Sequence, residues 1–325
     1  MNSQELVKVI DANDLDHIQY CFLQKKAFEK VLFKNKISSD YLTPDFFKWK
    51  YSSPAGQAKL AIVERNGKIL ASVAYMPVFI MHKNEILKIW QCGDIAMMPN
   101  SGLKGITSKC MIALNAYLAE NSFLYGFPND KSWPIVKRIG FQLIQHVDFF
   151  GKFAVNTFNN VPISEFTSYY NDQDDYAKRL NALNFTMIYR SKEYMNWRYV
   201  KKPVCKYYCF NSRENNLVMG NVVLRIVEIK RIKLLLIMEF TYLSKKAECD
   251  LLKYIKNVAS LNKCRIIGIF STNLFKPEFL RTGFIQIPSY FMPKEQIFVC
   301  KPSYGNDHPL LHVKWFVQTG DWDAF

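Results

Sequence analysis

The sequence predicts an α/β protein of two tandem domains, each with a central mixed, mostly antiparallel sheet flanked by helices. The 325 residues match two domains of ordinary size. Strand-like and helix-like runs alternate along the chain, and their order repeats once. With 49% hydrophobic and 15% aromatic residues, each half has enough apolar side chains for its own core.

In the first half, the pattern begins with a strand at 6–10 and a helix at about 14–28. Thr43 followed by Pro44 predicts the start of a second helix. Asn66-Gly67 between two apolar runs predicts a β-hairpin. The expected elements around and after that turn are strands 60–64 and 69–76, strands 77–86 and 87–98, helix 106–119, strand 123–127, a short helix 133–138 and paired strands within 141–155.

The second half repeats this order. Trp197-Arg198-Tyr199 before Pro203 resembles Trp49-Lys50-Tyr51 before Pro54. Gly283-Phe284 likewise resembles Gly140-Phe141, at a similar distance along the chain. The expected elements are strands 205–210, 217–228 and 233–242, helix 246–259, strand 266–271 and a short helix 277–281. We therefore expect domains at 1–160 and 185–325, joined by a linker with a helix at 161–184.

The charge balance favours anionic partners. The 43 basic and 28 acidic residues give a formal charge of +15. Coenzyme A, nucleotide-sugars, anionic lipid and nucleic acid all fit this charge, although lysine-rich chains are often basic without binding nucleic acid. We expect no stable nucleic-acid complex.

Cysteine usage and hydropathy point to the cytoplasm. The eight cysteines are scattered and form no CxxC pair, as is typical of buried free thiols in a reducing compartment. Residues 1–8 lack the pattern of a signal peptide, and no apolar run reaches about 18 residues, so we expect no transmembrane segment. The dispersed histidines predict no metal site.

A glycine-bearing turn between a strand and a helix is the main candidate for ligand binding. The strand at 94–99 leads into Asn100–Ser108, and the helix follows. The first amides of a helix lack internal acceptors and favour anions. Gly102 and Gly105 permit close backbone approach, while Lys104 and Thr107 add a charge and a hydroxyl. A diphosphate would fit, although such a turn can also be a plain helix start, and it matches neither a Walker loop nor GxGxxG.

With this turn, the chain resembles the GNAT superfamily of N-acyltransferases. That family's pyrophosphate loop has the form [QR]-x-x-G-x-[GA], and in Gly102–Thr107 only Gly105 matches it. A second resemblance is Phe123–Asn129, a short helix from Ser132, and then Gly140-Phe141. The family's usual tyrosine acid is replaced here by Val136. Because main-chain amides do the binding in this family, these departures leave the resemblance in place.

The resemblance implies acetyl-CoA, or another acyl-CoA, as co-substrate and no metal. The second domain enters its long helix through Leu243–Lys246 without a glycine, so we expect it to form a wall of the substrate cleft. The cofactor-binding residues implied by the resemblance and the turn are Ile95, Ala96, Met97, Gly102, Leu103, Lys104, Gly105, Ile106, Thr107, Asn129 and Ser132.

Three groups of polar residues are candidates for the chemistry. Asp94, in an apolar strand, is the first choice for a catalytic base, with a turn cap as the alternative. His146 and Asp148 would share one face of a late strand, where His146 could move protons and Asp148 could bind the substrate, although a lone histidine is more often structural. Asp321 and Asp323 near Trp322 could bind the substrate, unless this segment is simply solvated.

The chain also resembles two-domain GNAT proteins associated with bacterial surface-polysaccharide biosynthesis. This implies an acyl-CoA-dependent N-acyltransferase, and more narrowly an N-acetyltransferase, whose acceptor is the amine of a nucleotide- or lipid-linked amino sugar. A Fem-type transferase using aminoacyl-tRNA is one alternative. A catalytically decayed binding module of the same fold is the other. The segments carrying this resemblance are Trp49-Lys50-Tyr51, Gly126–Asn129, Trp197-Arg198-Tyr199 and 315–325.

Overall fold

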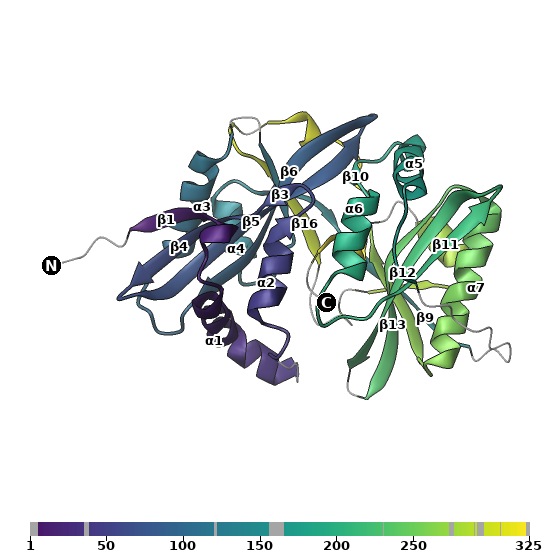
Figure 1. Ribbon diagram of the computed structural model, residues 1–325, viewed down its shortest axis with the longest axis horizontal. Helices are drawn as coiled ribbons and strands as arrows, with labels where there is room; N and C mark the ends of the chain where they lie inside the picture. Colours follow the sequence, from purple (N-terminus) through teal and green to yellow (C-terminus); the bar gives the residue numbers. More distant parts are fainter. Residues whose placement is uncertain are drawn as a thin grey trace.

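The computed structural model shows two mixed sheets, each with helices packed on it (Figure 1). No helix in the described part of the chain is long and apolar enough to cross a membrane. The structure describes residues 6–35, 39–119, 122–155, 166–229, 231–272, 276–288, 290, 296–305 and 307–322.

The first sheet has the order β1-β4-β5-β6-β7-β16-β8, with the short β10 paired to β5. β6 and β7 run parallel, and the other neighbours are antiparallel. A small separate pair, β2 (Ser52–Ser53) and β3 (Gly56–Gln57), follows α2. The strands of the first sheet are β1 (Val7–Asp11), β4 (Lys59–Arg65), β5 (Lys68–His82), β6 (Glu85–Met97), β7 (Phe123–Gly126), β8 (Gln142–His146), β10 (Met187–Ile188) and β16 (Ile297–Pro302).

The second sheet has the order β11-β12-β13-β14-β9-β15. Here β13 and β14 are the parallel neighbours, and the remaining pairs are antiparallel. Two mixed, mostly antiparallel sheets confirm the predicted fold class. The strands are β9 (Asp148–Phe153), β11 (Tyr208–Glu214), β12 (Leu217–Ile229), β13 (Ile232–Tyr242), β14 (Ile266–Ser271) and β15 (Ile285–Ile287).

The two sheets exchange a strand. β9, from the first half, lies between β14 and β15, whereas β16, from the second half, lies between β7 and β8. The expectation of paired strands within 141–155 is therefore wrong: β8 ends at His146 and β9 begins at Asp148 in the other sheet. A strand's side-chain pattern specifies a buried face and not the partner that supplies it. The domain boundaries at 160 and 185 stay a prediction. A cut of the chain at either point would separate β9 from the rest of the second sheet and β16 from the rest of the first.

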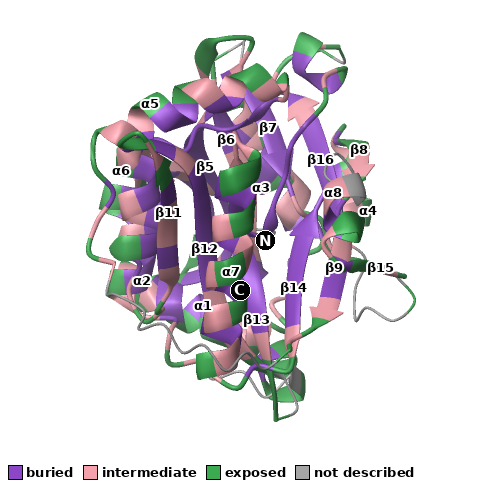
Figure 2. Ribbon diagram, turned by 90° about the vertical axis from the view of Figure 1, so that its right-hand side faces the viewer, coloured by how far each residue is buried: buried purple, intermediate pink, exposed green. Residues whose placement is uncertain are grey.

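Helices cover both faces of the first sheet and the outer face of the second. α1 (His17–Asn35) and α2 (Pro44–Tyr51) share one hydrophobic cluster with β4, β5 and β6, and α3 (Ile106–Tyr117) and α4 (Trp133–Arg138) pack on the opposite face. Figure 2 shows α7 (Lys245–Leu261) across the second sheet with its exposed residues outward. The remaining helices are α5 (Asp172–Arg179), α6 (Lys192–Met195), continued by a π-helical turn Asn196–Val200, and α8 (Lys276–Arg281).

Local sequence signals account for several element ends. The Thr43 side chain accepts a hydrogen bond from the Phe46 amide and starts α2, as Ser244 does for α7. The Asn66-Gly67 hairpin is confirmed. The expected break near Pro77 is wrong, because β5 continues to His82 and turns at Lys83-Asn84, with φ of 46° and 67°. A lysine seldom adopts the left-handed conformation of such a turn, so Lys83-Asn84 is not a pattern that predicts one.

The duplicated tryptophans meet. The rings of Trp49 and Trp197 stack with centroids 5.1 Å apart. Trp49 Nε1 donates to the Trp197 carbonyl at 2.8 Å, and Trp197 Nε1 donates to the Trp49 carbonyl at 2.9 Å. A reciprocal contact of equivalent residues is what an internal twofold relation produces. Together with the reciprocal strand exchange, it supports a duplicated architecture.

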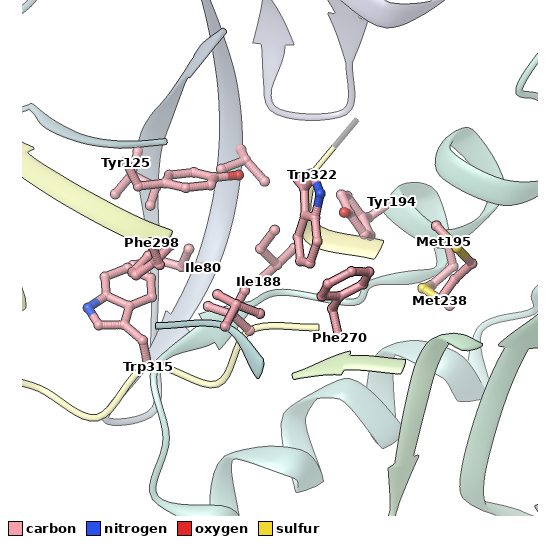
Figure 3. Packing of buried hydrophobic residues seen from close by; sticks show 14 of the residues in the cluster. Ile80, Tyr125, Ile188, Tyr194, Met195, Met238, Phe270, Phe298, Trp315 and Trp322 are labelled. Carbon is pink, nitrogen blue, oxygen red and sulfur yellow. The ribbon is translucent and has the colours of Figure 1, made fainter. Parts of the chain in front are cut away.

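A shared core joins the sheets. Figure 3 shows Tyr125, Ile80 and Phe298 of the first sheet in the same cluster as Phe270 and Met238 of the second. Trp322 packs between the two groups, with ring centroids 4.8 Å from Phe127 and 5.6 Å from Phe270. The segment Trp315–Trp322 is therefore internal, which the aromatic residues in it had suggested.

Candidate functional site

The parallel strands of the first sheet separate at one end. β6 and β7 pair from Trp90 opposite Leu124 to Cys92 opposite Gly126. β7 ends there, while β6 continues to Met97. We call the gap beyond this point the first opening; main-chain groups of β6, including those of Ile95–Met97, border it.

A β-bulge lies where the first opening begins. The pairing of β6 with β5 shifts between Gly93 opposite Ala74 and Ala96 opposite Ser72, so two residues of β6 face one of β5. Asp94, inside the bulge, has a φ of 48°, which is uncommon for a residue with a side chain. Bulges redirect the main chain and often occur beside functional sites.

Asp94 is anchored from α2. Its Oδ1 accepts from Lys50 Nζ at 2.8 Å, and its Oδ2 accepts from the Tyr51 hydroxyl at 2.7 Å. The Tyr51 hydroxyl lies 2.6 Å from that of the buried Tyr20, to which Gln24 donates. Both carboxylate oxygens therefore have partners that hold the bulge in place. These partners were not predicted, although a lysine and a tyrosine stand beside the repeated tryptophan in Trp49-Lys50-Tyr51.

The turn after β6 is open to an anion. Gly102 and Gly105 have φ of 74° and 71°, and a Cβ at either position would meet no atom within 4 Å. Gly105 precedes α3, and no side chain caps this helix. Among the described residues, the amides of Ile106, Thr107 and Ser108 donate to no acceptor. The turn thus combines free helix-start amides with space above them.

The side chains of this turn divide into anchors and exposed groups. Leu103 and Ile106 are buried in the cluster beneath α3, so only their main chains could reach a ligand. Lys104 is exposed, and Thr107 is half-buried. The two glycines and Lys104 are therefore the exposed part of the turn.

Asn129 and Ser132 form a local cap at the start of α4. Asn129 Oδ1 accepts from the amides of Lys131 and Ser132 at 3.0 and 3.1 Å, and the Ser132 hydroxyl accepts from the Asn129 amide at 2.9 Å. Their polar atoms serve the turn that follows β7. Their predicted contact with the cofactor stays a prediction.

The second sheet has an equivalent opening, which is filled. β13 and β14 pair from Leu234 with Ile266 to Ile237 with Ile269, and β13 then continues to Tyr242. The segment Val317–Asp321 lies in the gap. It bonds both strands: the Phe240 amide donates to Gln318 Oε1 at 2.7 Å, and the Phe270 amide donates to Thr319 Oγ1 at 2.9 Å. The chain itself thus occupies the position that is open in the first sheet.

Buried charges fix this segment. Arg190 donates from Nε to Glu239 at 2.6 Å and from Nη2 to Asp321 at 2.9 Å. Glu239 also accepts from the Tyr199 hydroxyl at 2.5 Å and from Gln318 at 3.0 Å. Burial raises the pKa of Asp321 to about 6, although the Arg190 guanidinium opposes the shift.

A pocket lies between the two halves of the chain, next to the first opening. Gln91 and Tyr125, which pair with each other one position before the end of the β6–β7 pairing, form part of its wall, and the Tyr125 hydroxyl donates to Gln91 at 3.3 Å. Gly320 and Asp321 also line it. The polar residues that line it are Ser53, Gln91, Tyr125, Tyr189, Ser191, Tyr194, Arg198 and Asp321.

The structure separates the other predicted residues. His146 ends β8 and Asp148 begins β9, so the prediction that they share one face of a strand is wrong. His146 is exposed, whereas Asp148 Oδ2 is buried with no hydrogen-bond partner in the described structure. Neither they nor Asp94 line the pocket. Asp323 lies outside the described residues.

Cys92 offers no thiolate and Val136 no acid. Burial raises the pKa of the Cys92 thiol, at the first opening, to about 12, so the thiol stays protonated near neutral pH. Val136 is buried in the core, so no acid replaces the missing tyrosine at that position. Within the described ranges, no three His, Cys, Asp or Glu side chains gather as metal ligands.

Solved structures share this architecture. A conserved protein of unknown function from Enterococcus faecalis V583, a probable N-acyltransferase, aligns over 93% of this chain and 73% of its own, with 14% identity and a TM-score of 0.61. A GCN5-related N-acetyltransferase from Anabaena variabilis ATCC 29413 aligns over 92% and 73%, with 10% identity and a TM-score of 0.61.

N-myristoyltransferase from Saccharomyces cerevisiae, solved with bound myristoyl-CoA, aligns over 93% of this chain and 80% of its own, with 11% identity and a TM-score of 0.54. No family profile and no curated protein sequence matches the chain. At these identities the likeness concerns the fold. The chain therefore has the fold of the GNAT N-acyltransferases, with two such sheets in tandem.

Proposed function

We propose that this protein is an acyl-CoA-dependent N-acyltransferase. The observation that carries the proposal is the open, uncapped turn Gly102–Ser108, which directly follows the strand that borders the first opening. The free amides would hold the diphosphate of coenzyme A, with Lys104 adding charge. The thioester arm would then lie along β6 in the first opening.

The acyl transfer needs an amine without its proton, a polarised carbonyl and a leaving thiolate. Main-chain amides of β6 within Ile95–Met97 would polarise the thioester carbonyl, because the bulge at Asp94 turns this part of the strand. We keep Asp94 and His146 as the proposed residues for proton transfer. Asp94 can take a proton only if Lys50 or Tyr51 releases one of its oxygens.

The acceptor would occupy the pocket between the halves, where it meets the first opening. Its lining combines tyrosines, serines and a glutamine with apolar and aromatic side chains, which suits a polar acceptor carrying an amine, and Asp321 remains a proposed contact for that amine. We propose an amino sugar, nucleotide- or lipid-linked, of bacterial surface-polysaccharide biosynthesis. Asp148 and Asp323 remain proposed substrate contacts. All eight cysteines are free, which suits our placement of the protein in the cytoplasm.

Thermal unfolding with and without acetyl-CoA tests the proposal. We expect millimolar acetyl-CoA to raise the melting temperature of the unaltered protein, because a ligand that binds only the folded state stabilises it. Gly105→Val should abolish this increase, since a side chain there would cover the free amides.

Gly67→Val is the matched control. Gly67 has a φ of 68° and equally open surroundings, but it lies in the β4–β5 hairpin turn. This variant should lose some stability and still respond to acetyl-CoA. An unaltered protein that does not respond, or an equal loss of response in both variants, would contradict the proposal.

A further inference from the structure

The outer side of α1 carries an exposed apolar line. Tyr20 and Leu23 pack toward the first sheet, where they are buried. The large apolar side chains on the other side of the helix are exposed: Ile18 by 75%, Phe22 by 54% and Phe33 by 87%.

These three side chains are aligned. Phe22 follows Ile18 by four residues and precedes Phe33 by eleven, which is close to one and three helical turns of 3.6 residues. They therefore lie along one side of α1, at an edge of the molecule away from the second sheet (Figure 1). Single exposed apolar residues are ordinary, but an aligned set on one helix marks an interaction surface.

Lysines accompany this line. α1 contains four lysines, Lys25, Lys26, Lys30 and Lys34, and one acidic residue, Glu29, which lies 3.2 Å from Lys26. Glu29 falls on the line itself, between Phe22 and Phe33, and Lys25 lies at its edge, whereas Lys30 and Lys34 fall to one side. The helix thus has an excess of positive charge around an apolar centre, in a chain whose formal charge is +15.

Exposed apolar side chains beside lysines indicate what kind of partner α1 would bind. A second copy of the chain would place lysines against lysines, whereas anionic headgroups would neutralise them. Helices that rest in a lipid interface have this arrangement: apolar side chains enter the boundary of the acyl chains, and lysines reach the phosphates.

We propose that α1 docks on an anionic lipid surface, with Ile18, Phe22 and Phe33 inserted below the headgroups and the flanking lysines among them. The inference does not depend on acyl transfer. Nothing in it requires a membrane-spanning segment, because the helix would lie in the plane of the surface.

Co-sedimentation with lipid vesicles tests the inference. We expect the protein to bind vesicles of phosphatidylglycerol and phosphatidylcholine in equal parts, and to bind phosphatidylcholine alone much less. The double variant F22S/F33S should bind at least about tenfold more weakly, because each phenylalanine loses its apolar burial. Each Lys→Gln change at Lys25, Lys30 or Lys34 should weaken binding by about fivefold.

Phe153→Ser is the matched control, because Phe153 is 81% exposed on β9, outside α1. This variant should bind like the unaltered protein, and circular dichroism should show that all variants fold. Three results would overturn the inference: no binding to the anionic vesicles, an equal loss of binding in the control, or a dimer in solution that F22S/F33S abolishes while vesicle binding is unaffected.

Discussion

At the scale of residues, Asp94 connects the bulge of β6 to α2. The Lys50 side chain that it pairs with is 6% exposed, and that of Asp94 is 17% exposed. A pair this far from solvent depends on both partners, because each charge alone would be poorly solvated.

We therefore expect Asp94→Asn to lower the free energy of unfolding by about 3 kcal/mol, since Lys50 would be left buried beside a neutral amide. Urea denaturation measures this loss. Asp11→Asn is the control: it breaks the more exposed pair with Lys59 and should cost less than about 1 kcal/mol. If Asp94→Asn unfolds like the unaltered protein but transfers no acyl group, Asp94 acts as the base and not as an anchor.

Asp321 makes stability depend on pH. Its pKa rises by burial from the usual 3.8 to about 6 in the folded protein. The folded state therefore binds a proton more tightly than the unfolded state, and the contribution of Asp321 to stability falls as the pH rises through this range.

Asp321→Asn should remove this dependence. The difference in free energy of unfolding between the unaltered protein and the variant should decrease from pH 4 to pH 6 and then level off. Urea denaturation at several pH values in this interval measures it. A difference that stays constant with pH would show that Asp321 titrates at its ordinary pKa.

At the scale of elements, the two openings are built alike but filled differently. The β6–β7 opening borders a glycine turn with free amides, whereas Val317–Asp321 occupies the β13–β14 opening. This segment fits closely: a Cβ on Gly320 would lie 2.0 Å from the Tyr199 hydroxyl and 2.5 Å from Glu239. The helix that follows β13 begins with Ser244, whose side chain caps the Ala247 amide.

We therefore expect one acyl-CoA to bind per chain. Isothermal titration with acetyl-CoA should give a stoichiometry of one, and Gly105→Val should remove that site. Two sites per chain would contradict a filled second opening. No site at all would instead contradict the proposed function.

At the scale of the whole molecule, strand exchange makes the two sheets interdependent. β9 is internal to the second sheet and β16 is internal to the first, so neither half of the chain contains all the strands of one sheet. The shared cluster around Phe298, Trp315 and Trp322 adds to this dependence.

We expect one cooperative unfolding transition. Scanning calorimetry should show a single peak, and a fragment cut near residue 160 should fail to fold alone, because its sheet would lack the strand between β7 and β8. Two separate peaks, or a stably folded first fragment, would show that the exchange contributes little to stability.

The sequence by itself determined the two-sheet α/β class, the duplication and the glycine turn. These follow from local signals: alternating apolar patterns, the Asn66-Gly67 hairpin, the paired tryptophans and the spacing of Gly102 and Gly105 before a helix. The open turn was predicted because helix-start amides and positive φ are properties of a few neighbouring residues.

Only the tertiary structure decided how these parts combine. The exchange of β9 and β16, the anchoring of Asp94 by Lys50 and Tyr51, and the filling of the second opening by Val317–Asp321 all join residues far apart in the chain. A side-chain pattern predicts that a face is buried or that a charge is paired, but many different partners could bury that face or pair with that charge. The choice among them depends on packing of the whole molecule, which no local stretch of sequence encodes.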